Sequence, residues 1–541
     1  MRLPTHVIGQ ILVLSLGVTT VAKTQTIIEP HLHSDVAAGM PSERLGRVSF
    51  ANSCSPAVQA RFERGVALLH SFWWQEGERT FREVLARDPK CAIATWGIAT
   101  ILIGNPFGTG PAPAQTQQAK EAITRGREIG AKTERERLFV EAVAQYYEGP
   151  ADRPHGARLK ALSDAFEKLA ARFSADDEAQ IFSALYLAAT QDPSEKTFAT
   201  ALKAAAILEV EFKKHPDHPG VAHYLIHSYD YPTIAVKGLT AARRYSEIAP
   251  SAPHALHMPS HIFTRVGAWQ DSVASNVRSA STAKDENAFV DQLHAMDYLV
   301  YAYLQLARDS DARHVVEEAP SVRGDDRVRA SPYALAAIPA RYAIERHEWK
   351  EAAKLQPQAT RFPYTAAFTH FARALGSARG GDAAAAEYDV QALARIVEAL
   401  KASKDAYWAT EVEVGRLSGA AWVAFARGDH GTAVDLMRAA ADLEDTSEKS
   451  AISPARLVPA HELLGDMLLE SGNAADAFAE YERSLLRDPN RFRTLYGAGQ
   501  AAAESGNRER ARHYFSRLID MAGSGEPRPE TEAARRYVAT N

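Results

Sequence analysis

The histidines of this 541-residue chain are unevenly placed, and seven of the 19 lie between positions 215 and 261. Four of the seven form two pairs with the spacing H-x-x-x-H: His223 with His227, and His257 with His261. Residues four apart share one face of an α-helix. Neutral imidazole binds zinc, copper, iron and nickel, and this spacing commonly presents two ligands to one ion. The pairs therefore predict a transition-metal site.

The two pairs are related by a fixed shift along the chain. His223 and His257 are 34 residues apart, and so are His227 and His261. If 34 residues is one structural repeat, the pairs occupy equivalent positions on neighbouring helices, about 10 Å apart, and their side chains can converge. Other nearby groups can join them, either as ligands or as outer partners that orient a ring. The candidate ligands for zinc, copper or iron are His223, His227, Asp230, His254, His257, His261 and His294.

A structural alternative stays open at this point. Buried histidines commonly pack and hydrogen-bond without any metal, and duplication of a repeat can copy a structural H-x-x-x-H pair. The sequence contains no phosphate-binding loop, no G-x-S-x-G elbow and no H-E-x-x-H motif. It therefore assigns no catalytic residue and no organic cofactor, and it leaves open whether the protein is an enzyme.

A 34-residue repeat does run through the chain. The pattern is a small residue, a second small residue 12 positions on, an aromatic after four more, and a proline after eight more, which is typical of tetratricopeptide (TPR) repeats. The small residues let two helices approach closely, the aromatic fills the groove between repeats, and proline ends the second helix. The pattern is carried by Gly465, Ala477, Tyr481 and Pro489, and again by Gly65, Gly77, Phe81 and Pro89.

We therefore predict an all-α protein, a TPR-type α-solenoid of antiparallel helix pairs wound as a right-handed superhelix over residues 49–541. No stretch alternates as a β-strand would. The first functional expectation is binding of a protein, a peptide or a small ligand in the concave groove, which is an analogy at the level of the fold. The metal site is the alternative. The clearest repeats are 58–91, 219–253, 254–287, 458–491 and 492–525.

The N-terminus predicts export. Residues 1–22 contain Arg2, an apolar run over 7–18 and small residues before a cut after Ala22, which is typical of a secretory signal peptide. The apolar run is shorter than the roughly 20 residues of a spanning helix, although an uncleaved anchor is the alternative. Residues 23–48 are expected to be an extended lead-in. We expect a periplasmic or extracellular protein with no transmembrane segment after cleavage.

The two cysteines and the net charge give less information about the function than the histidines and the repeats do. Cys54 and Cys91 lie 37 residues apart, close to one repeat, so they can meet side by side in an exported protein. The alternatives are a disulfide that staples the first repeat and two buried free thiols. A net charge of -5 gives no reason to expect a nucleic-acid partner.

Several segments also resemble a family of bacterial exported TPR proteins. They are HYLIHSYDYP, SAPHALHMPSHIFTRVGAWQDSVASN, HAMDYLVYAYLQ and the stretch that begins LLHSFWWQEG. The resemblance extends from about Cys54 to about Pro489. It implies the repeat fold and export, and it implies no activity, so no catalytic residue is carried over from it.

Overall fold

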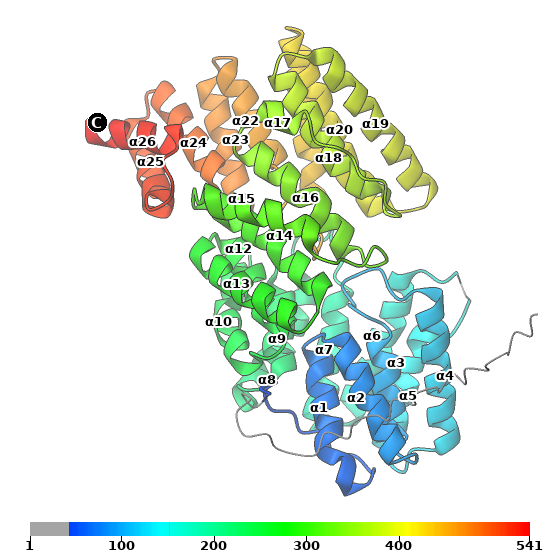
Figure 1. Cartoon of the computed structure of the whole chain (residues 1–541). Helices are drawn as coiled ribbons and strands as arrows, with labels where there is room; N and C mark the ends of the chain where they lie inside the picture. Colours follow the sequence, from blue (N-terminus) through cyan, green and yellow to red (C-terminus); the bar gives the residue numbers. More distant parts are fainter. Residues whose placement is uncertain (1–42, 151, 541) are drawn as a thin grey trace, which may run out of the picture. The chain divides into compact units, whose positions relative to one another are not determined.

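The structure is a computed structural model that describes residues 43–150 and 152–540. The predicted signal peptide (1–22) and most of the predicted lead-in (23–48) lie outside these residues. Throughout the described residues the secondary structure is helical, with no β-strand, as predicted for the fold class (Figure 1). None of the helices described is long and apolar enough to span a bilayer.

The helices follow one another as pairs joined by short connections, and each packs against the next in the chain. The first part of the chain contains α1 (Gln59–His70), α2 (Trp74–Arg87), α3 (Ile93–Ile101), α4 (Pro113–Ile129), α5 (Glu134–Tyr147), α6 (His155–Arg172), α7 (Asp177–Ala189), α8 (Ala199–Lys214), α9 (Pro219–Tyr229), α10 (Leu239–Ile248), α11 (Pro253–His257), α12 (Pro259–Val266) and α13 (Trp269–Asp285). The second part contains α14 (Phe289–Gln305), α15 (Asp309–Glu318), α16 (Ala330–Glu345), α17 (Trp349–Ala352), α18 (Pro363–Arg379), α19 (Ala383–Ala402), α20 (Ala406–Ala426), α21 (His430–Asp445), α22 (Ala460–Glu470), α23 (Ala474–Arg487), α24 (Phe492–Glu504), α25 (Arg508–Ala522) and α26 (Pro529–Thr540).

The glycines and the aromatic residues of the repeat motif pack against each other, as their residue types suggest. The ring of Phe81 in α2 lies so close to α1 and α3 that a Cβ atom on Gly65 or Gly97 would meet it at 2.9 or 2.6 Å. One repeat from the end of the array, a Cβ on Gly497 would meet the Tyr481 ring at 2.4 Å. Atoms in folded proteins do not approach so closely. Glycine is therefore needed where the aromatic side chain fills the space between three helices.

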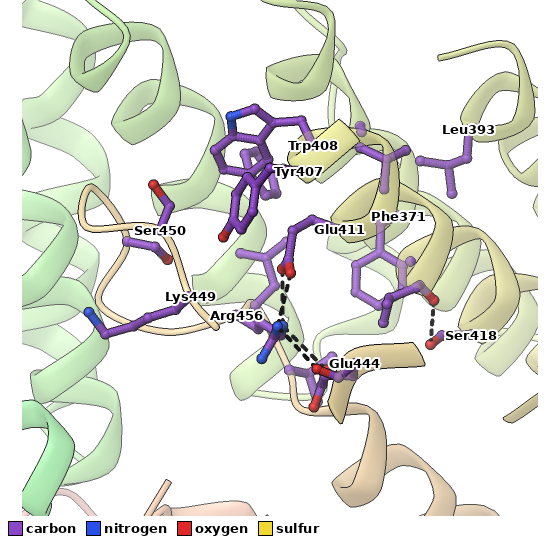
Figure 2. A pocket seen from close by; sticks show the side chains of 18 of the residues that line it. Phe371, Leu393, Tyr407, Trp408, Glu411, Ser418, Glu444, Lys449, Ser450 and Arg456 are labelled. Carbon is purple, nitrogen blue, oxygen red and sulfur yellow. Dashed lines mark hydrogen bonds and ion pairs between the residues drawn. The ribbon is translucent and has the colours of Figure 1, made fainter. Parts of the chain in front are cut away.

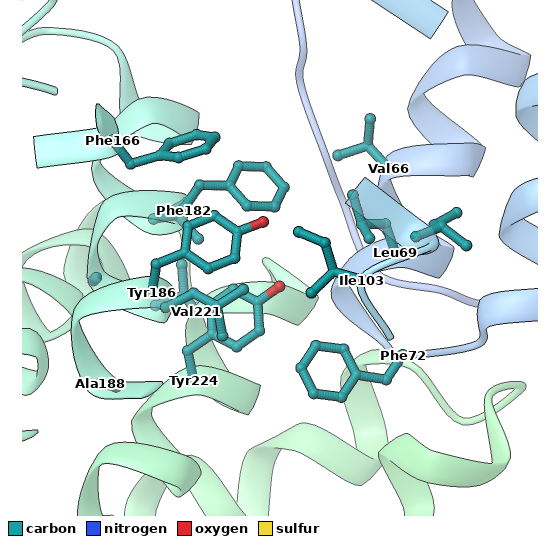
Figure 3. Close-up of a cluster of buried hydrophobic side chains, with 14 of the residues drawn as sticks. Val66, Leu69, Phe72, Ile103, Phe166, Phe182, Tyr186, Ala188, Val221 and Tyr224 are labelled. Atoms are coloured by element: carbon teal, nitrogen blue, oxygen red, sulfur yellow. The ribbon is translucent and has the colours of Figure 1, made fainter. Parts of the chain in front are cut away.

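A cluster of buried aromatic side chains fixes α9, the helix of the first histidine pair. Phe166 of α6, Phe182 and Tyr186 of α7, Tyr224 of α9 and Phe72 after α1 lie together in this cluster (Figure 3). Their burial stabilises the arrangement through apolar area removed from water. The result is that α9 is held against both α7 and α1, elements far apart in the sequence.

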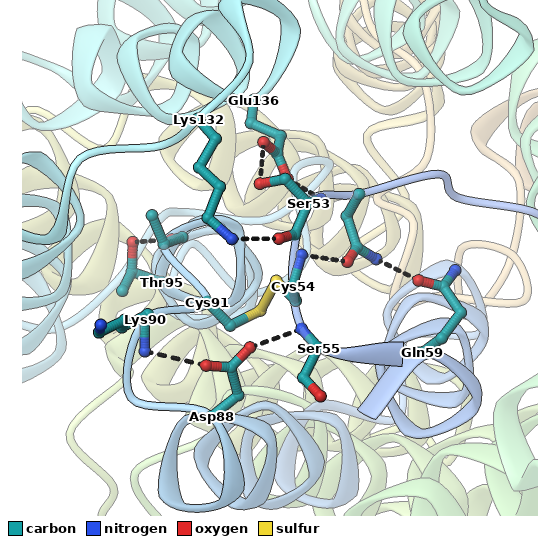
Figure 4. The surroundings of a disulfide bond; sticks show 12 residues. Ser53, Cys54, Ser55, Gln59, Asp88, Lys90, Cys91, Thr95, Lys132 and Glu136 are labelled. Carbon is teal, nitrogen blue, oxygen red and sulfur yellow. Dashed lines mark hydrogen bonds between the residues drawn. A yellow bond between two sulfur atoms is a disulfide. The ribbon is translucent and has the colours of Figure 1, made fainter. Parts of the chain in front are cut away.

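The two cysteines are bonded in the structure. The sulfur atoms of Cys54 and Cys91 are 2.00 Å apart, with their Cα atoms 4.7 Å apart (Figure 4). The bond joins the segment before α1 to the connection between α2 and α3. Beside it, the carboxylate of Asp88 accepts hydrogen bonds from the backbone N–H groups of Ser55 (2.7 Å) and Lys90 (3.1 Å). The first repeat is therefore closed by a covalent bond and by a hydrogen-bonded turn.

The helix of the second histidine pair begins earlier than its sequence suggests. Pro259 indicates a start near residue 255 with His254 in the preceding turn, because proline is tolerated only in a first helical turn. The structure instead has α11 from Pro253 to His257, followed directly by α12 from Pro259. Each proline occupies the first position of its own short helix. His254 therefore lies within α11, on the same helical segment as His257.

The connection between α21 and α22 crosses to the histidine helices. We call residues 446–459 the crossing segment. Within it, Glu448 pairs with Lys196 (3.0 Å), and Lys449 donates to the Asp230 carboxylate after α9 (3.2 Å). The guanidinium of Arg341 in α16 donates to the carbonyl of Ala455 (3.1 Å). The crossing segment therefore contacts residues that lie more than 100 positions away in the sequence, among them Asp230 at the end of α9.

One further buried histidine lies at the end of the crossing segment. His461 in α22 contacts the carboxylates of Glu480 (2.6 Å) and Asp445 (3.2 Å). Burial lowers its pKa, but hydrogen bonds to these two carboxylates outweigh burial and raise the pKa to about 9. This histidine makes structural ion pairs and lies outside the seven candidate ligands.

Candidate metal centre

Four helical elements bring the predicted ligands together. His223 and His227 come from α9, His254, His257 and His261 from α11 and α12, and His294 from α14. The four histidines of the H-x-x-x-H pairs are 0–6% exposed. His254 and His294 are partly exposed, so four of the six imidazoles lie fully inside the protein and the other two lie at its edge. Burial is the largest cause that lowers the pKa of each of them, so these rings are neutral, the form that binds metal ions.

Within each H-x-x-x-H pair the two imidazole rings face each other through their Nε2 atoms. The Nε2 atoms of His223 and His227 are 3.1 Å apart, and the Nε2 atoms of His257 and His261 are also 3.1 Å apart. Two nitrogens at 2.0–2.1 Å from one tetrahedral ion would be roughly 3.3 Å apart. Both pairs therefore already have the separation that two ligands of one ion require.

The second pair has its ring protons fixed by its neighbours. The side-chain NH2 of Asn276 in α13 donates to the carbonyl of Ser272 (2.8 Å), so its Oδ1 faces His257 Nδ1 at 2.7 Å and accepts a hydrogen bond. The Nδ1 of His261 donates to the carboxylate of Asp230 (2.9 Å). In a neutral imidazole only one nitrogen carries hydrogen. Both facing Nε2 atoms are therefore unprotonated.

Two unprotonated nitrogens 3.1 Å apart repel each other unless something positive lies between or beside them. A proton would make one ring an imidazolium. For His261 the Asp230 carboxylate favours this form, but burial, with the nearby cations Lys449 and Arg265, outweighs it and lowers the pKa. The hydroxyl of Tyr298 in α14 lies 3.3 Å from His261 Nε2, but it donates its hydrogen to the Ser453 carbonyl (3.1 Å). A metal ion bound by both lone pairs removes the conflict. His257 and His261 thus present their Nε2 atoms as two ligands of one metal ion would.

The first pair has a similar but less constrained arrangement. His223 Nδ1 donates to the backbone carbonyl of His70 at 2.6 Å, which leaves its Nε2 as an acceptor. The ring of His227 stacks on Phe107, with ring centres 4.0 Å apart. The neighbouring His254 has a buried Nε2 with no hydrogen-bond partner among the described residues. A buried polar atom without a partner is costly, so this atom is also placed to accept a ligand bond.

Each pair gains a third histidine, which gives two triads. We call His223, His227 and His254 the first triad, and His257, His261 and His294 the second triad. Within each triad, one nitrogen of each residue lies within 4.8 Å of the others. Three imidazoles around one position form a common protein ligand set for zinc and copper.

Asp230 is placed to orient a ligand rather than to bind an ion. Its carboxylate accepts from His261 Nδ1, pairs with Arg265 Nε (2.9 Å) and accepts from Lys449 Nζ (3.2 Å). Burial raises the pKa of this carboxyl, but these cations outweigh burial and hold it well below its usual range. Burial lowers the pKa of Lys449 to about 8 despite its contact with the carboxylate. A carboxylate on the outer nitrogen of a histidine raises the basicity of the inner nitrogen.

A nearby group of titratable residues provides a contrast. Both Glu178 oxygens accept from histidines, His70 Nε2 at 3.0 Å and His218 Nε2 at 3.1 Å. The other nitrogen of His218 accepts from the Val221 N–H (3.3 Å), and that of His70 contacts the Tyr224 hydroxyl (2.9 Å). Every polar atom of this group has a partner. It is therefore a structural network, unlike the triads.

Sequence reasoning assigned no individual role to four features of this centre: Asn276, Phe107, Tyr298 and the crossing segment. Asn276 lies in a helix with no unusual spacing, and Phe107 lies in an irregular Pro- and Gly-rich loop. Tyr298 is four residues after His294, so the i,i+4 rule could have identified it. His70, by contrast, supports the centre through its backbone carbonyl, a role that no residue type predicts.

Comparison with known proteins yields only distant similarity. No family model matches the chain, and no curated protein matches it. Among solved structures, a human IFIT1 dimer with PPP-AAAA has a TM-score of 0.36 and 12% sequence identity over 76% of this chain and 88% of that chain. The Cut9–Hcn1 hetero-tetramer of the APC/C has a TM-score of 0.29 and 11% identity over 88% of this chain and 96% of that chain. These scores are too low to support any argument about function.

Proposed function

We propose that this protein is a metalloprotein whose buried histidine centre binds a transition metal, with copper, zinc and iron as the candidates. The observation that carries the proposal is the second triad, in which the Nε2 atoms of His257 and His261 face each other at 3.1 Å while both Nδ1 atoms contact outer acceptors. Outer hydrogen bonds to Asn276 and Asp230 hold both rings in this state. Such outer partners are typical of metal-bound histidines.

The helical repeats would then act as the frame for the centre. Three consecutive repeats supply the ligands through α9, through α11 with α12, and through α14. The crossing segment closes the centre through Lys449, which contacts Asp230. A buried ion that is held by rigid helices and excluded from water keeps its ligands and resists exchange.

Elemental analysis tests the proposal. The full chain is produced without a polyhistidine tag, and metal content is measured for the wild type and for the His227→Ala/His261→Ala double variant. We expect near-stoichiometric copper, zinc or iron in the wild type and loss of metal in the variant at unchanged helicity. His461→Gln is the matched control, because it removes a buried histidine outside the triads. A wild-type chain that binds none of the three metals after anaerobic reconstitution would contradict the proposal.

A second candidate function is the binding of a small ligand by the repeat scaffold. A cavity of about 70 Å³ lies between α18, α20 and the crossing segment, with Phe371, Trp408 and Lys449 among its lining residues (Figure 2). The pair of Arg456 and Glu411 (2.9 Å) lies at its wall. Its size favours a small molecule over the peptide or protein expected from the fold alone. A Trp408→Ala variant tests whether the two functions are separate. They are separate if the variant keeps its metal but is no longer stabilised by the ligand.

We also propose that the protein is exported, since the first 22 residues have the composition of a signal peptide and the chain forms a disulfide. Fractionation of cells that produce the full chain tests this. Mature protein that begins at Lys23 and is found outside the cytoplasm is the expected result. A full-length cytoplasmic chain with reduced cysteines would contradict it.

A further inference from the structure

We propose that the centre holds two copper ions, one on each triad, and that this pair in the Cu(I) state binds dioxygen as a shared ligand. The inference rests on the proposed function, and it adds the number of ions, their identity and the small molecule that they bind. Four features carry it: the completeness of the first triad, the proximity of the two triads, the local charge, and the number of ligands in each triad.

The first triad is a complete site in its own right. It has the same 3.1 Å separation between its paired Nε2 atoms as the second triad, and a backbone carbonyl fixes the proton of His223 on Nδ1. Its third member, His254, has a buried Nε2 without any hydrogen-bond partner. A single ion on the second triad would leave that nitrogen unsatisfied. Two ions satisfy all six histidines.

The triads are neighbours. The ring centre of His227 is 6.1 Å from that of His261, and the ring centre of His254 is 6.0 Å from that of His257. Rings at this separation are compatible with the roughly 3.5–4 Å between ions of two-metal sites, in which both ions act on one bound molecule. A diatomic ligand is small enough to lie between such ions.

The charge around the centre favours monovalent ions. The two nearby anions, Asp230 and Glu448, are already balanced by the cations that pair with them, which are Arg265, Lys449, Lys196 and Arg487. The six imidazoles are neutral. Two divalent ions would therefore introduce four uncompensated charges into a buried site, whereas two Cu(I) ions introduce two. The cost of burying an ion rises with the square of its charge, so Cu(I) is favoured over zinc.

The number of ligands leads to the same metal. Each triad offers three nitrogens, and no thiolate or carboxylate joins either group. Cu(I) is satisfied by three nitrogens, whereas structural zinc sites almost always have four ligands. Imidazole is a ligand that copper accepts readily. The neutral three-nitrogen sites therefore suit a pair of Cu(I) ions.

The reaction with dioxygen balances without another reactant. Each Cu(I) gives one electron and becomes Cu(II), and dioxygen takes both electrons and becomes peroxide bound between the ions. No proton is transferred and no bond to protein forms, so release of dioxygen returns both electrons to copper. The Tyr298 hydroxyl, which donates to the Ser453 carbonyl (3.1 Å) and lies 3.3 Å from His261 Nε2, is positioned beside this ligand.

An anaerobic titration with Cu(I) tests the inference, with a chromophoric chelator as competitor. We expect two coppers per wild-type chain, and one per chain in His254→Ala and in His294→Ala, each of which removes one ligand from one triad. His461→Gln should still bind two. Circular dichroism checks that each variant is folded, and the glutamine variants at 254 and 294 replace any alanine variant that is not.

Exposure to oxygen provides the second measurement. We expect the wild type to take up one dioxygen per two coppers and to give no copper signal in electron paramagnetic resonance, because two Cu(II) ions that share a ligand couple. The one-copper variants should give the signal of isolated Cu(II). One copper per wild-type chain, or the full signal of two isolated Cu(II) ions, would overturn this inference and leave the proposed function intact. Absence of any bound metal would overturn both.

Discussion

Replacement of Asn276 by leucine is the sharpest test of how the second triad works. The Asn276 amide accepts the 2.7 Å hydrogen bond from His257 Nδ1, and its own NH2 group donates to Ser272. Leucine has a similar size but no acceptor. In Asn276→Leu the proton of His257 can move to Nε2 and be donated to His261, which satisfies the metal-free pair and blocks the ligand atom.

The expected magnitude follows from that change. Loss of an outer partner of a metal-bound histidine typically weakens metal binding about 10- to 100-fold. This corresponds to roughly 1.4–2.7 kcal/mol of binding free energy. A buried N–H left without an acceptor costs about 1–3 kcal/mol, but the moved proton recovers part of this in the metal-free protein. Metal affinity should therefore fall more than the stability of the metal-free chain.

Competition with a chelator of known affinity measures the loss of metal affinity, and thermal unfolding of the metal-free protein measures stability. Ser279→Ala is the matched control, since Ser279 lies one turn further along α13 and its hydroxyl donates to the Pro253 carbonyl (2.9 Å) away from the rings. This control should lose about 1 kcal/mol of stability and no metal affinity. If Asn276→Leu binds metal as tightly as the wild type, His257 does not bind through Nε2 and the reasoning fails.

Three further predictions concern the frame. Cys54→Ser removes a bond that closes a loop of 37 residues, so the first repeat should lose about 4 kcal/mol of stability relative to the oxidised wild type in chemical denaturation, and the reduced wild type should match the variant. Gly497→Ala places a methyl group 2.4 Å from the Tyr481 ring and should cost about 1–3 kcal/mol, whereas no loss in denaturant midpoint would refute the packing argument. His461 has a pKa raised to about 9 by its carboxylate partners, so its contribution to stability is full below pH 6.5 and is lost as the pH rises toward 9. The destabilisation by His461→Gln should accordingly be large at pH 6 and small at pH 9.5, and equal effects at both values would contradict the assignment.

The repeats could be predicted from sequence because their packing depends on local residue types. Small residues opposite an aromatic side chain recur at fixed offsets, and the structure shows why, since the Phe81 ring leaves no room for a Cβ on Gly97. The two histidine spacings, four residues within a pair and 34 residues between pairs, could be recognised in the sequence for the same reason. Helix periodicity alone places His223 and His227 on one face.

The closure of the centre could not be predicted in this way. The crossing segment has no helical periodicity, and its contact between Lys449 and Asp230 joins residues 219 positions apart. The proton positions of the rings depend on Asn276 and on a backbone carbonyl, neither of which has a sequence signature. Pro253 also shifted the helix start, because two prolines six residues apart each begin a short helix. The expectation of a binding groove followed from the repeats, whereas the contacts of the crossing segment depend on long-range packing.

The structural alternative is that duplication of a repeat copied a packing motif. This alternative predicts something different from a metal centre. A copied motif should keep equivalent partners in both copies. Here the outer partner of His223 is a carbonyl from α1, 153 residues away in sequence, whereas that of the equivalent His257 is a side chain of α13. Different surroundings nevertheless hold both paired Nε2 separations at 3.1 Å and both Nδ1 atoms as donors. What the two copies share is therefore the orientation of the nitrogens that face each other, which is the property that two ligands of one metal ion require.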